Sequence, residues 1–123
     1  MEIEVGEYVR DRAGNIARVI KNNNDIFEIE LNSGVRINQF IEFMTKHSKN
    51  IIDLLEVGDI VMYKIGIIKA TGIGRIGIVN KFNDARSGKE VTLIDGYKPE
   101  EIDILKILTR EQFEANCYKT DIK

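Results

Sequence analysis

The stretch Val5-Gly6-Glu7-Tyr8-Val9 returns later in the chain as Val57-Gly58-Asp59-Ile60-Val61, offset by 52 residues. A second pair of stretches, Ile41–Lys46 and Leu105–Arg110, shares the order apolar, charged, apolar, apolar, Thr, basic, and is offset by 64 residues. The two offsets predict an internal repeat whose second copy contains about 12 extra residues. Because extra residues in one copy of a repeat usually form loops on a working face, we expect function there.

Short strand-like runs separated by turn residues dominate the first copy. The run Ile26–Leu31 alternates apolar and acidic residues, which is typical of a strand with one solvated face. Turn signals such as Asn32-Ser33-Gly34 separate neighbouring runs. A set of short strands with tight turns in about 45 residues predicts a small SH3-like barrel. The expected strands are Val5–Arg10, Ile16–Lys21, Ile26–Leu31, Val35–Ile37 and Ile41–Met44.

The second copy repeats this pattern and ends in a helix signal. Its strands are predicted at residues 59–64, 76–82, 90–94 and 104–108. Thr109 and Gln112 then form a capping box at the start of a helix, and Leu108 and Phe113 form a hydrophobic staple. The helix is short, so we expect it to dock on the second barrel through the face that carries Phe113 and Cys117.

These patterns predict a mainly β protein with two tandem SH3-like barrels and a short C-terminal helix. The first repeat with its connector spans residues 1–55, and the second repeat with the helix spans residues 56–123. A core of about 50 residues is marginal by itself, so we expect the two repeats to share an interface. A single pseudo-symmetric domain is the alternative description.

Composition and charge limit the classes of function. A chain of 123 residues that is 43% hydrophobic folds around a core rather than remaining disordered. The net charge is −2, yet residues 60–89 hold six Lys or Arg residues against Asp84 alone, which predicts a basic patch on an acidic body. A single Cys fits a reducing cytoplasm. No apolar run approaches the roughly 18 residues of a membrane span.

The basic segment is the strongest candidate for a binding surface. Its cationic side chains could neutralise phosphates, and its aromatic rings could stack on bases. The same loops of small barrels also bind proteins, so a protein surface, a nucleic-acid surface and an ordinary solvated loop remain open. The candidate binding residues are Tyr63, Lys69, Arg75, Lys81, Phe82, Arg86 and Lys89.

Other motifs are discounted on physical grounds. The stretch Gly72-Ile73-Gly74-Arg75-Ile76-Gly77 spells the dinucleotide fingerprint G-x-G-x-x-G, but a β-prone run follows it where a helix is needed. We therefore predict a hairpin whose glycines supply positive φ or bulges. His47 and Cys117, each the single residue of its type, are too few for a structural metal site, so no metal or cofactor is predicted.

No catalytic constellation is evident either. His47 with the nearby Ser48 or Asp53 is formally a triad, but adjacent residues seldom face each other and no nucleophile elbow is present. The acidic cluster Glu100–Asp103 is interpreted as a solvated turn rather than a pair of catalytic carboxylates. We therefore predict no enzyme.

Three stretches resemble small uncharacterised proteins encoded by phages and prophages of Firmicutes: Val5–Arg10, Lys46–Asp59 and Ile107–Glu114. The resemblance brings no catalytic residues, and it implies a mobile-element protein in the cytoplasm of a bacterial host. Small accessory proteins of this kind often bind and block a host factor, including CRISPR effectors. We expect a binding protein that occupies the surface of a host protein, as an anti-CRISPR-like inhibitor would. The alternative is a nucleic-acid-binding module that uses residues 60–89.

Overall fold

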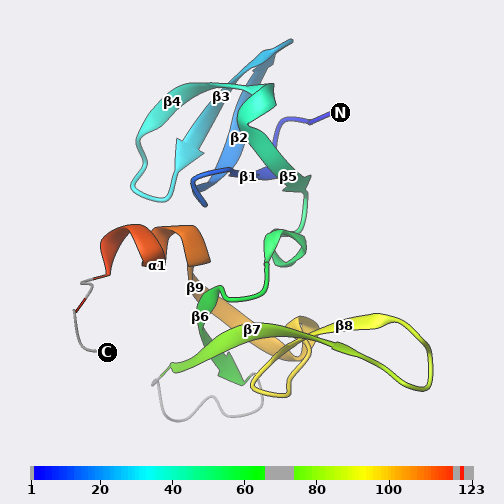
Figure 1. Ribbon diagram of the computed structural model, residues 1–123. Coiled ribbons are helices and arrows are strands. Elements are labelled where there is room, and N and C mark those ends of the chain that lie inside the picture. Colours follow the sequence, from blue (N-terminus) through cyan, green and yellow to red (C-terminus); the bar gives the residue numbers. More distant parts are fainter. Residues whose placement is uncertain (1, 66–73, 118–119, 121–123) are drawn as a thin grey trace. The chain divides into compact units, whose positions relative to one another are not determined.

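The computed structural model describes residues 2–65, 74–117 and 120 (Figure 1). The chain divides into two compact units, Met1–Leu54 and Leu55–Lys123. Each unit contains one antiparallel sheet, and a short helix follows the last strand of the second unit. The predicted mainly β class with a short C-terminal helix is therefore confirmed.

The first unit is a five-stranded sheet in which the first strand lies between the second and the last. Its order is β4-β3-β2-β1-β5, and the 3-10 turn η1 (Ile41–Phe43) leads into β5. A second 3-10 turn, η2 (Ile51–Leu54), follows β5. The strands are β1 (Tyr8–Asp11), β2 (Ile16–Asn23), β3 (Ile26–Leu31), β4 (Arg36–Phe40) and β5 (Met44–Ser48).

Side-chain alternation places the core on one face of this sheet. In β3, Phe27 and Ile29 are buried while Glu28 and Glu30 remain partly exposed, as the alternating sequence predicted. The buried cluster joins residues from the N-terminal segment and four strands. Its members are Ile3, Val9, Ala17, Val19, Phe27, Ile29 and Met44.

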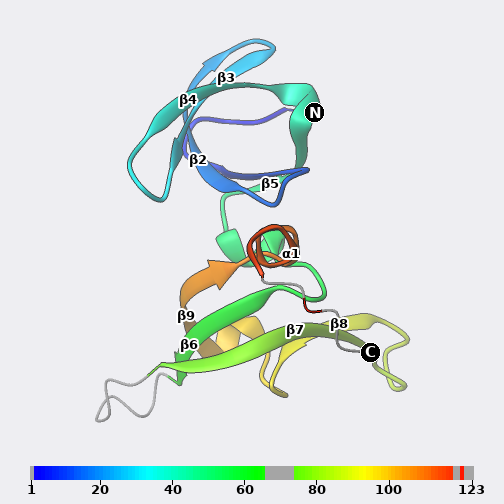
Figure 2. The same cartoon turned by 60° about the vertical axis from the view of Figure 1, so that its left-hand side comes forward.

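Among its described residues, the second unit has the same order of pairing with one strand fewer. Its sheet runs β8-β7-β6-β9, and the 3-10 turn η3 (Pro99–Glu101) leads into β9 (Figure 2). Both sheets are open in their hydrogen bonding, so the predicted closed barrels are not formed by strand pairing. The strands are β6 (Ile60–Ile65), β7 (Arg75–Asn83), β8 (Glu90–Ile94) and β9 (Ile102–Leu108).

Each unit opens with the same tight turn. In the first, the Glu7 N–H donates to the Glu4 carbonyl at 3.1 Å, and Gly6 adopts a φ of +93° that favours glycine. The Glu4 N–H in turn donates to the Glu7 carboxylate. Gly6 and Glu7 then exchange backbone bonds with Val19, at 2.9 and 2.8 Å, so the turn fixes where β1 meets β2.

The second unit repeats this turn bond for bond. The Asp59 N–H donates to the Glu56 carbonyl at 3.1 Å, Gly58 has a φ of +94°, and the Glu56 N–H donates to Asp59 Oδ2 at 2.8 Å. Gly58 and Asp59 exchange backbone bonds with Val79, at 3.0 and 2.9 Å. The matching sequences at residues 5–9 and 57–61 thus form matching local structures.

In both units the carboxylate of this turn also reaches the end of the last strand. Glu7 Oε1 lies 3.0 Å from His47 Nδ1 in β5. Asp59 Oδ1 accepts the Arg110 N–H at 2.9 Å, directly after β9. Both acidic residues are buried, so the carboxylates act in an environment that strengthens hydrogen bonds.

The second pair of sequence stretches does not occupy matching places. Ile41–Phe43 forms η1, whereas Leu105–Leu108 belongs to the end of β9. Strand pairing places Tyr8 opposite Ser48 and Ile60 opposite Leu108, so matching residues of the last strands are offset by 60 rather than 64. The predicted 12-residue insertion is therefore corrected to eight residues. An apolar and charged pattern does not distinguish a 3-10 turn from a strand, which explains the error.

The extra residues lie between β6 and β7. Tyr8 pairs with Arg18 and Ile60 pairs with Ile78, so the offset has already reached 60 at the second strand of each unit. Most of this connection, including the candidate residue Lys69, lies outside the described residues.

The C-terminal helix α1 (Arg110–Asn116) begins with the predicted capping box. Thr109 Oγ1 accepts the Gln112 N–H at 3.4 Å, and Gln112 Oε1 accepts the Thr109 N–H at 3.3 Å. No residue of α1 is buried, and Phe113 is 46% exposed, so the expected docking through Phe113 is not observed. Capping and the bond from Arg110 to Asp59 hold the helix start instead.

Replacing Asp59 with Asn tests the turn carboxylate. The two oxygens of Asp59 each accept one backbone N–H, from Glu56 and from Arg110. Asn has a single acceptor oxygen, so one donor loses its partner and we expect a loss of about 1–3 kcal/mol in the free energy of unfolding. Urea denaturation of the variant against the wild type gives this value. Asp103→Asn is the matched control, because Asp103 is exposed on β9 and should have little effect. Equal stabilities of the two variants would contradict the role of Asp59.

Acid titration tests the corresponding carboxylate in the first unit. The bond from the Glu4 backbone N–H lowers the pKa of Glu7 below its ordinary value of 4.5, although burial opposes the shift and the His47 contact assists it. A lowered folded-state pKa gives stability that is complete above about pH 4.5 and is lost as the pH falls through the folded-state pKa. The stability gap between the wild type and Glu7→Gln should narrow in that acidic range. A gap that is constant with pH would refute this assignment, and Glu42→Gln on the exposed surface serves as control.

Candidate binding surface

Four of the candidate residues lie on the hairpin formed by β7 and β8. Lys81 and Phe82 belong to β7, while Arg86 and Lys89 belong to the loop at the hairpin tip, and all four side chains are exposed. Arg75, also exposed, lies at the other end of β7. The structure therefore brings three cations and one aromatic ring onto a single hairpin.

A network around Asp84 holds the hairpin tip. Its carboxylate accepts the Arg86 N–H at 3.0 Å and the Ser87 hydroxyl at 3.2 Å, while its backbone N–H donates to the Lys89 carbonyl at 2.8 Å. The bond from the Arg86 backbone N–H, assisted by Ser87, lowers the pKa of Asp84. Asp84 thus remains ionised at neutral pH and works as a turn residue that positions the neighbouring cations.

Tyr63 differs from the other candidates because it belongs to the core. Its side chain is 1% exposed, and its hydroxyl donates to Asp95 Oδ2 at 2.8 Å. Burial, followed by the Asp95 contact, raises the pKa of Tyr63, and Arg75 on the opposing strand acts in the other direction. The ring is therefore a structural element and is not available to stack on a base or a partner side chain.

The outward face of β7 is apolar, which the sequence analysis did not identify. Val79 and Gly77 point inward and are buried, so the alternate residues point outward. Ile76 is 67% exposed, Ile78 is 51% exposed and Phe82 is 55% exposed. Alternation predicts that the more apolar side of a strand faces the core, whereas in β7 the side with Gly77 and Val79 is buried and the more apolar side is exposed.

Neighbouring strands extend this surface. Residues directly opposite each other in an antiparallel pair point to the same face, and the pairs are Ile76 with Met62, Ile78 with Ile60, and Ile60 with Leu108. On the other side of β7, Val91 lies opposite Phe82 and Leu93 opposite Asn80. We call this set the apolar outer face; it consists of Ile60, Met62, Ile76, Ile78, Phe82, Val91, Leu93 and Leu108.

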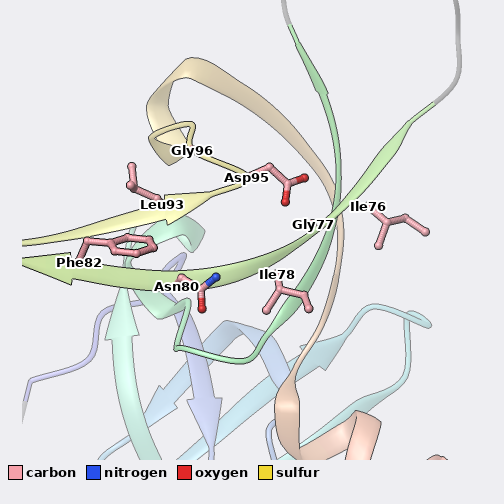
Figure 3. A pocket seen from close by; sticks show the side chains of 8 residues that line it. All are labelled: Ile76, Gly77, Ile78, Asn80, Phe82, Leu93, Asp95 and Gly96. Carbon is pink, nitrogen blue, oxygen red and sulfur yellow. The ribbon is translucent and has the colours of Figure 1, made fainter.

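A shallow cavity of about 540 Å³ indents this part of the second unit (Figure 3). Its lining combines apolar outer-face residues with a polar end formed by Asp95 and Gly96, which follow β8. The lining residues are Ile76, Gly77, Ile78, Asn80, Phe82, Leu93, Asp95 and Gly96. The cavity is a depression in the surface that can accept a side chain of a partner.

The glycine motif serves packing at this site. A Cβ on Gly77 would lie 2.6 Å from Asp95 Oδ2 and 2.8 Å from Ile94 Cγ2, so only glycine permits this close approach. Residues from Arg75 onward form a strand, and therefore no helix begins at the motif to bind a pyrophosphate. The φ of Gly77 is not positive, so the expected role of a glycine that supplies positive φ is wrong at this position.

The equivalent face of the first unit is charged at its centre, and the exposed residues Ile26 and Phe40 form an apolar pair at one end of it. Arg18 on β2 lies opposite Glu30 on β3, and Glu30 lies opposite Arg36 on β4. Arg36 Nε and Glu30 Oε2 are 3.2 Å apart and form an ion pair. The position that carries Arg18 in the first unit carries Ile78 in the second. The fold itself therefore does not require an apolar outer face.

His47 and Cys117 occupy structural positions. His47 contacts Glu7, while the Ser48 hydroxyl donates to Asp53 at 2.6 Å, so the formal triad of the sequence analysis is not assembled. The Cys117 thiol lies 3.6 Å from the Glu114 carbonyl within the last turn of the helix. Among the described residues, no three His, Cys, Asp or Glu side chains gather in a way that could hold a metal ion.

Comparisons with known proteins add no identity to this site. No protein-family model matches the chain, and neither the curated proteins nor the solved structures gave a match. In the described part of the chain, no helix combines the length and apolar character needed to cross a membrane.

Adding a methyl group at Gly77 tests the packing argument. Gly77→Ala should displace Asp95, weaken its bond with Tyr63 and reduce the free energy of unfolding by about 1–3 kcal/mol. The double variant with Asp95→Gly should recover part of this loss, because the nearest clashing atom is removed. Urea unfolding measures both values. A Gly77→Ala protein as stable as the wild type would contradict the close approach.

Proposed function

We propose that this chain is a non-enzymatic binding protein that acts by covering the surface of a partner protein. The observation that supports this proposal is the apolar outer face, on which Ile76, Ile78 and Phe82 are each more than half exposed. Large contiguous apolar patches are uncommon on monomeric soluble proteins and mark interaction sites. Complete burial of one such side chain contributes about 1.5–3 kcal/mol, and several together offset part of the entropic cost of association.

The charges around the apolar outer face suggest the chemistry of the partner. Arg86 and Lys89 are exposed at the hairpin tip, and Lys106 lies opposite Met62 on the neighbouring strand, whereas Lys81 points to the opposite face of β7. Stable interfaces combine an apolar centre with a polar rim. The complementary partner surface therefore carries apolar side chains with acidic groups at its border.

The shared strand order supports a further part of the proposal, that both units are SH3-like and derive from one internal repeat. In each unit the first strand pairs with the second and the last strands, and a 3-10 turn precedes the last strand. The opening turns also match bond for bond. The two copies then differ in their outer faces, which suits a division between a charged copy and a binding copy.

The biological context of the proposal comes from the sequence resemblance alone. Similarity to phage and prophage proteins of Firmicutes suggests a bacterial host protein as the partner and the host cytoplasm as the location. An inhibitor of host defence, such as an anti-CRISPR protein, acts by occupying a functional surface and needs no catalytic residue.

Charge substitution in the apolar outer face tests the proposal. In the double variant Ile76→Lys and Ile78→Lys, two exposed apolar side chains become cations, so the fold should persist while partner affinity falls by more than about tenfold. Capture from nuclease-treated host lysate identifies the partner, and calorimetry with the purified partner gives the affinity. The matched control replaces Val5 and Val35 with Lys, which are 58% and 54% exposed in the first unit. Equal affinities of both variants for that partner would refute the proposal.

The nucleic-acid alternative retains one supporting observation: Lys81, Arg86 and Lys89 are exposed on the hairpin that also exposes Phe82, with Lys81 and Phe82 on opposite faces of β7. It expects binding to DNA or RNA that weakens steeply with salt, and a flatter salt dependence after Lys81→Glu with Lys89→Glu. Binding that is insensitive to these charge reversals, or absent at low salt, would remove this alternative.

A further inference from the structure

The second unit exposes a strand edge that the first unit covers. In the first sheet β3 pairs with β2 on one side and with β4 on the other. In the second sheet β8 pairs with β7 but has no counterpart of β4 among the described residues. After β8 the chain turns back at once, and Ile94 and Tyr97 exchange backbone bonds at 2.8 and 2.9 Å. The rest of the β8 edge, from Glu90 to Leu93, has no partner strand among the described residues.

The hydrogen-bond pattern shows which backbone groups point outward at this edge. The N–H and C=O groups of Val79 bond to the turn before β6. In an antiparallel strand, successive residues direct these groups to opposite sides. Asn80 and Phe82 therefore direct theirs toward β8. Their partners Leu93 and Val91 complete those bonds. Glu90 and Thr92 therefore direct their N–H and C=O groups away from β7.

These outward groups are complementary to themselves. If the β8 strands of two copies run antiparallel with Val91 on the twofold axis, Glu90 of one copy lies opposite Thr92 of the other. Each of the two pairs exchanges two backbone bonds, so this register satisfies every outward group of Glu90 and Thr92 in both copies.

Side-chain chemistry favours the same register. On the apolar outer face, Val91 meets Val91 of the second copy, with Phe82 beside it on either side. On the opposite face, Glu90 lies next to Thr92 of the second copy. Within that copy Thr92 lies opposite Lys81, so Glu90 approaches a cation. Shifting the strands by two residues in one direction places Glu90 opposite Glu90, which sets like charges against each other. Shifting them by two residues in the other direction places Thr92 opposite Thr92. That pair is then the single hydrogen-bonded pair, because Ile94 already bonds to Tyr97. The register centred on Val91 is therefore preferred.

We propose that the chain forms a symmetric dimer through the edge of β8, which joins two four-stranded sheets into one continuous sheet. The dimer would pair an edge that otherwise remains open to uncontrolled association. It would also place the two apolar outer faces side by side on one surface. This inference concerns self-association and holds whether or not a host protein binds that surface.

Sedimentation velocity of the full chain, from micromolar to millimolar concentration, tests the dimer. The wild type and Thr92→Val should sediment with twice the chain mass. Val91→Lys places two cations opposite each other at the axis and should weaken self-association by at least about tenfold. Thr92→Pro removes an outward N–H that β7 does not use and should have the same effect. A wild type that stays monomeric, or a dimer unaffected by both edge variants, would overturn the proposal.

A cross-link provides a second measurement that does not depend on disrupting the edge. In the proposed register the two Val91 residues form a non-hydrogen-bonded pair, whose Cβ atoms are close enough for a disulfide. In a Cys117→Ser background, Val91→Cys should form a covalent dimer on mild oxidation, whereas Leu93→Cys should not, because Leu93 does not face itself. Equal cross-linking of both cysteine variants, or of neither, would contradict the register.

Discussion

A buried carboxylate at the end of each opening turn is the interaction on which the structure depends. Glu7 in the first unit and Asp59 in the second accept a backbone N–H from their own turn and reach the end of the last strand. A buried carboxylate is costly unless it is fully hydrogen-bonded, so it holds its donors in one arrangement. In each unit the same carboxylate therefore links the start of the first strand to the end of the last one.

This constraint explains why the two sheets agree on one face and differ on the other. The turn fixes the registers of the first strand with the second and with the last, which determines which residues point inward. Val9 and Val61 are buried at matching positions as a result. The outer face carries no such requirement, so Arg18 in one unit and Ile78 in the other are compatible with the same framework. Function can therefore change there at little cost in stability.

Local rules account for what the sequence predicted well. The alternation in Ile26–Leu31 and the capping box of Thr109 and Gln112 depend on near neighbours, and both are present in the structure. The strands predicted at residues 76–82 and 90–94 also form, as β7 and β8. Short-range chemistry thus identified the class of the fold and the helix start.

Features that depend on distant residues were not accessible in the same way. The burial of Tyr63 depends on Asp95, and the choice of glycine at position 77 depends on the same carboxylate. The match between Ile41–Lys46 and Leu105–Arg110 was wrong by four positions, because register is set by strand pairing rather than by composition. The apolar outer face was missed because alternation predicts that the more apolar side of β7 is buried, whereas the structure buries the side with Gly77 and Val79.

The amide of Arg110 provides the most direct test of the carboxylate tie. Arg110 is the first residue of α1, and the N–H groups of a first helical turn have no partner within the helix. The bond to Asp59 predicts that this amide exchanges with solvent deuterium as slowly as amides of the β6–β7 ladder, and that Asp59→Asn removes this protection. Fast exchange of the Arg110 amide in the wild type would contradict the account.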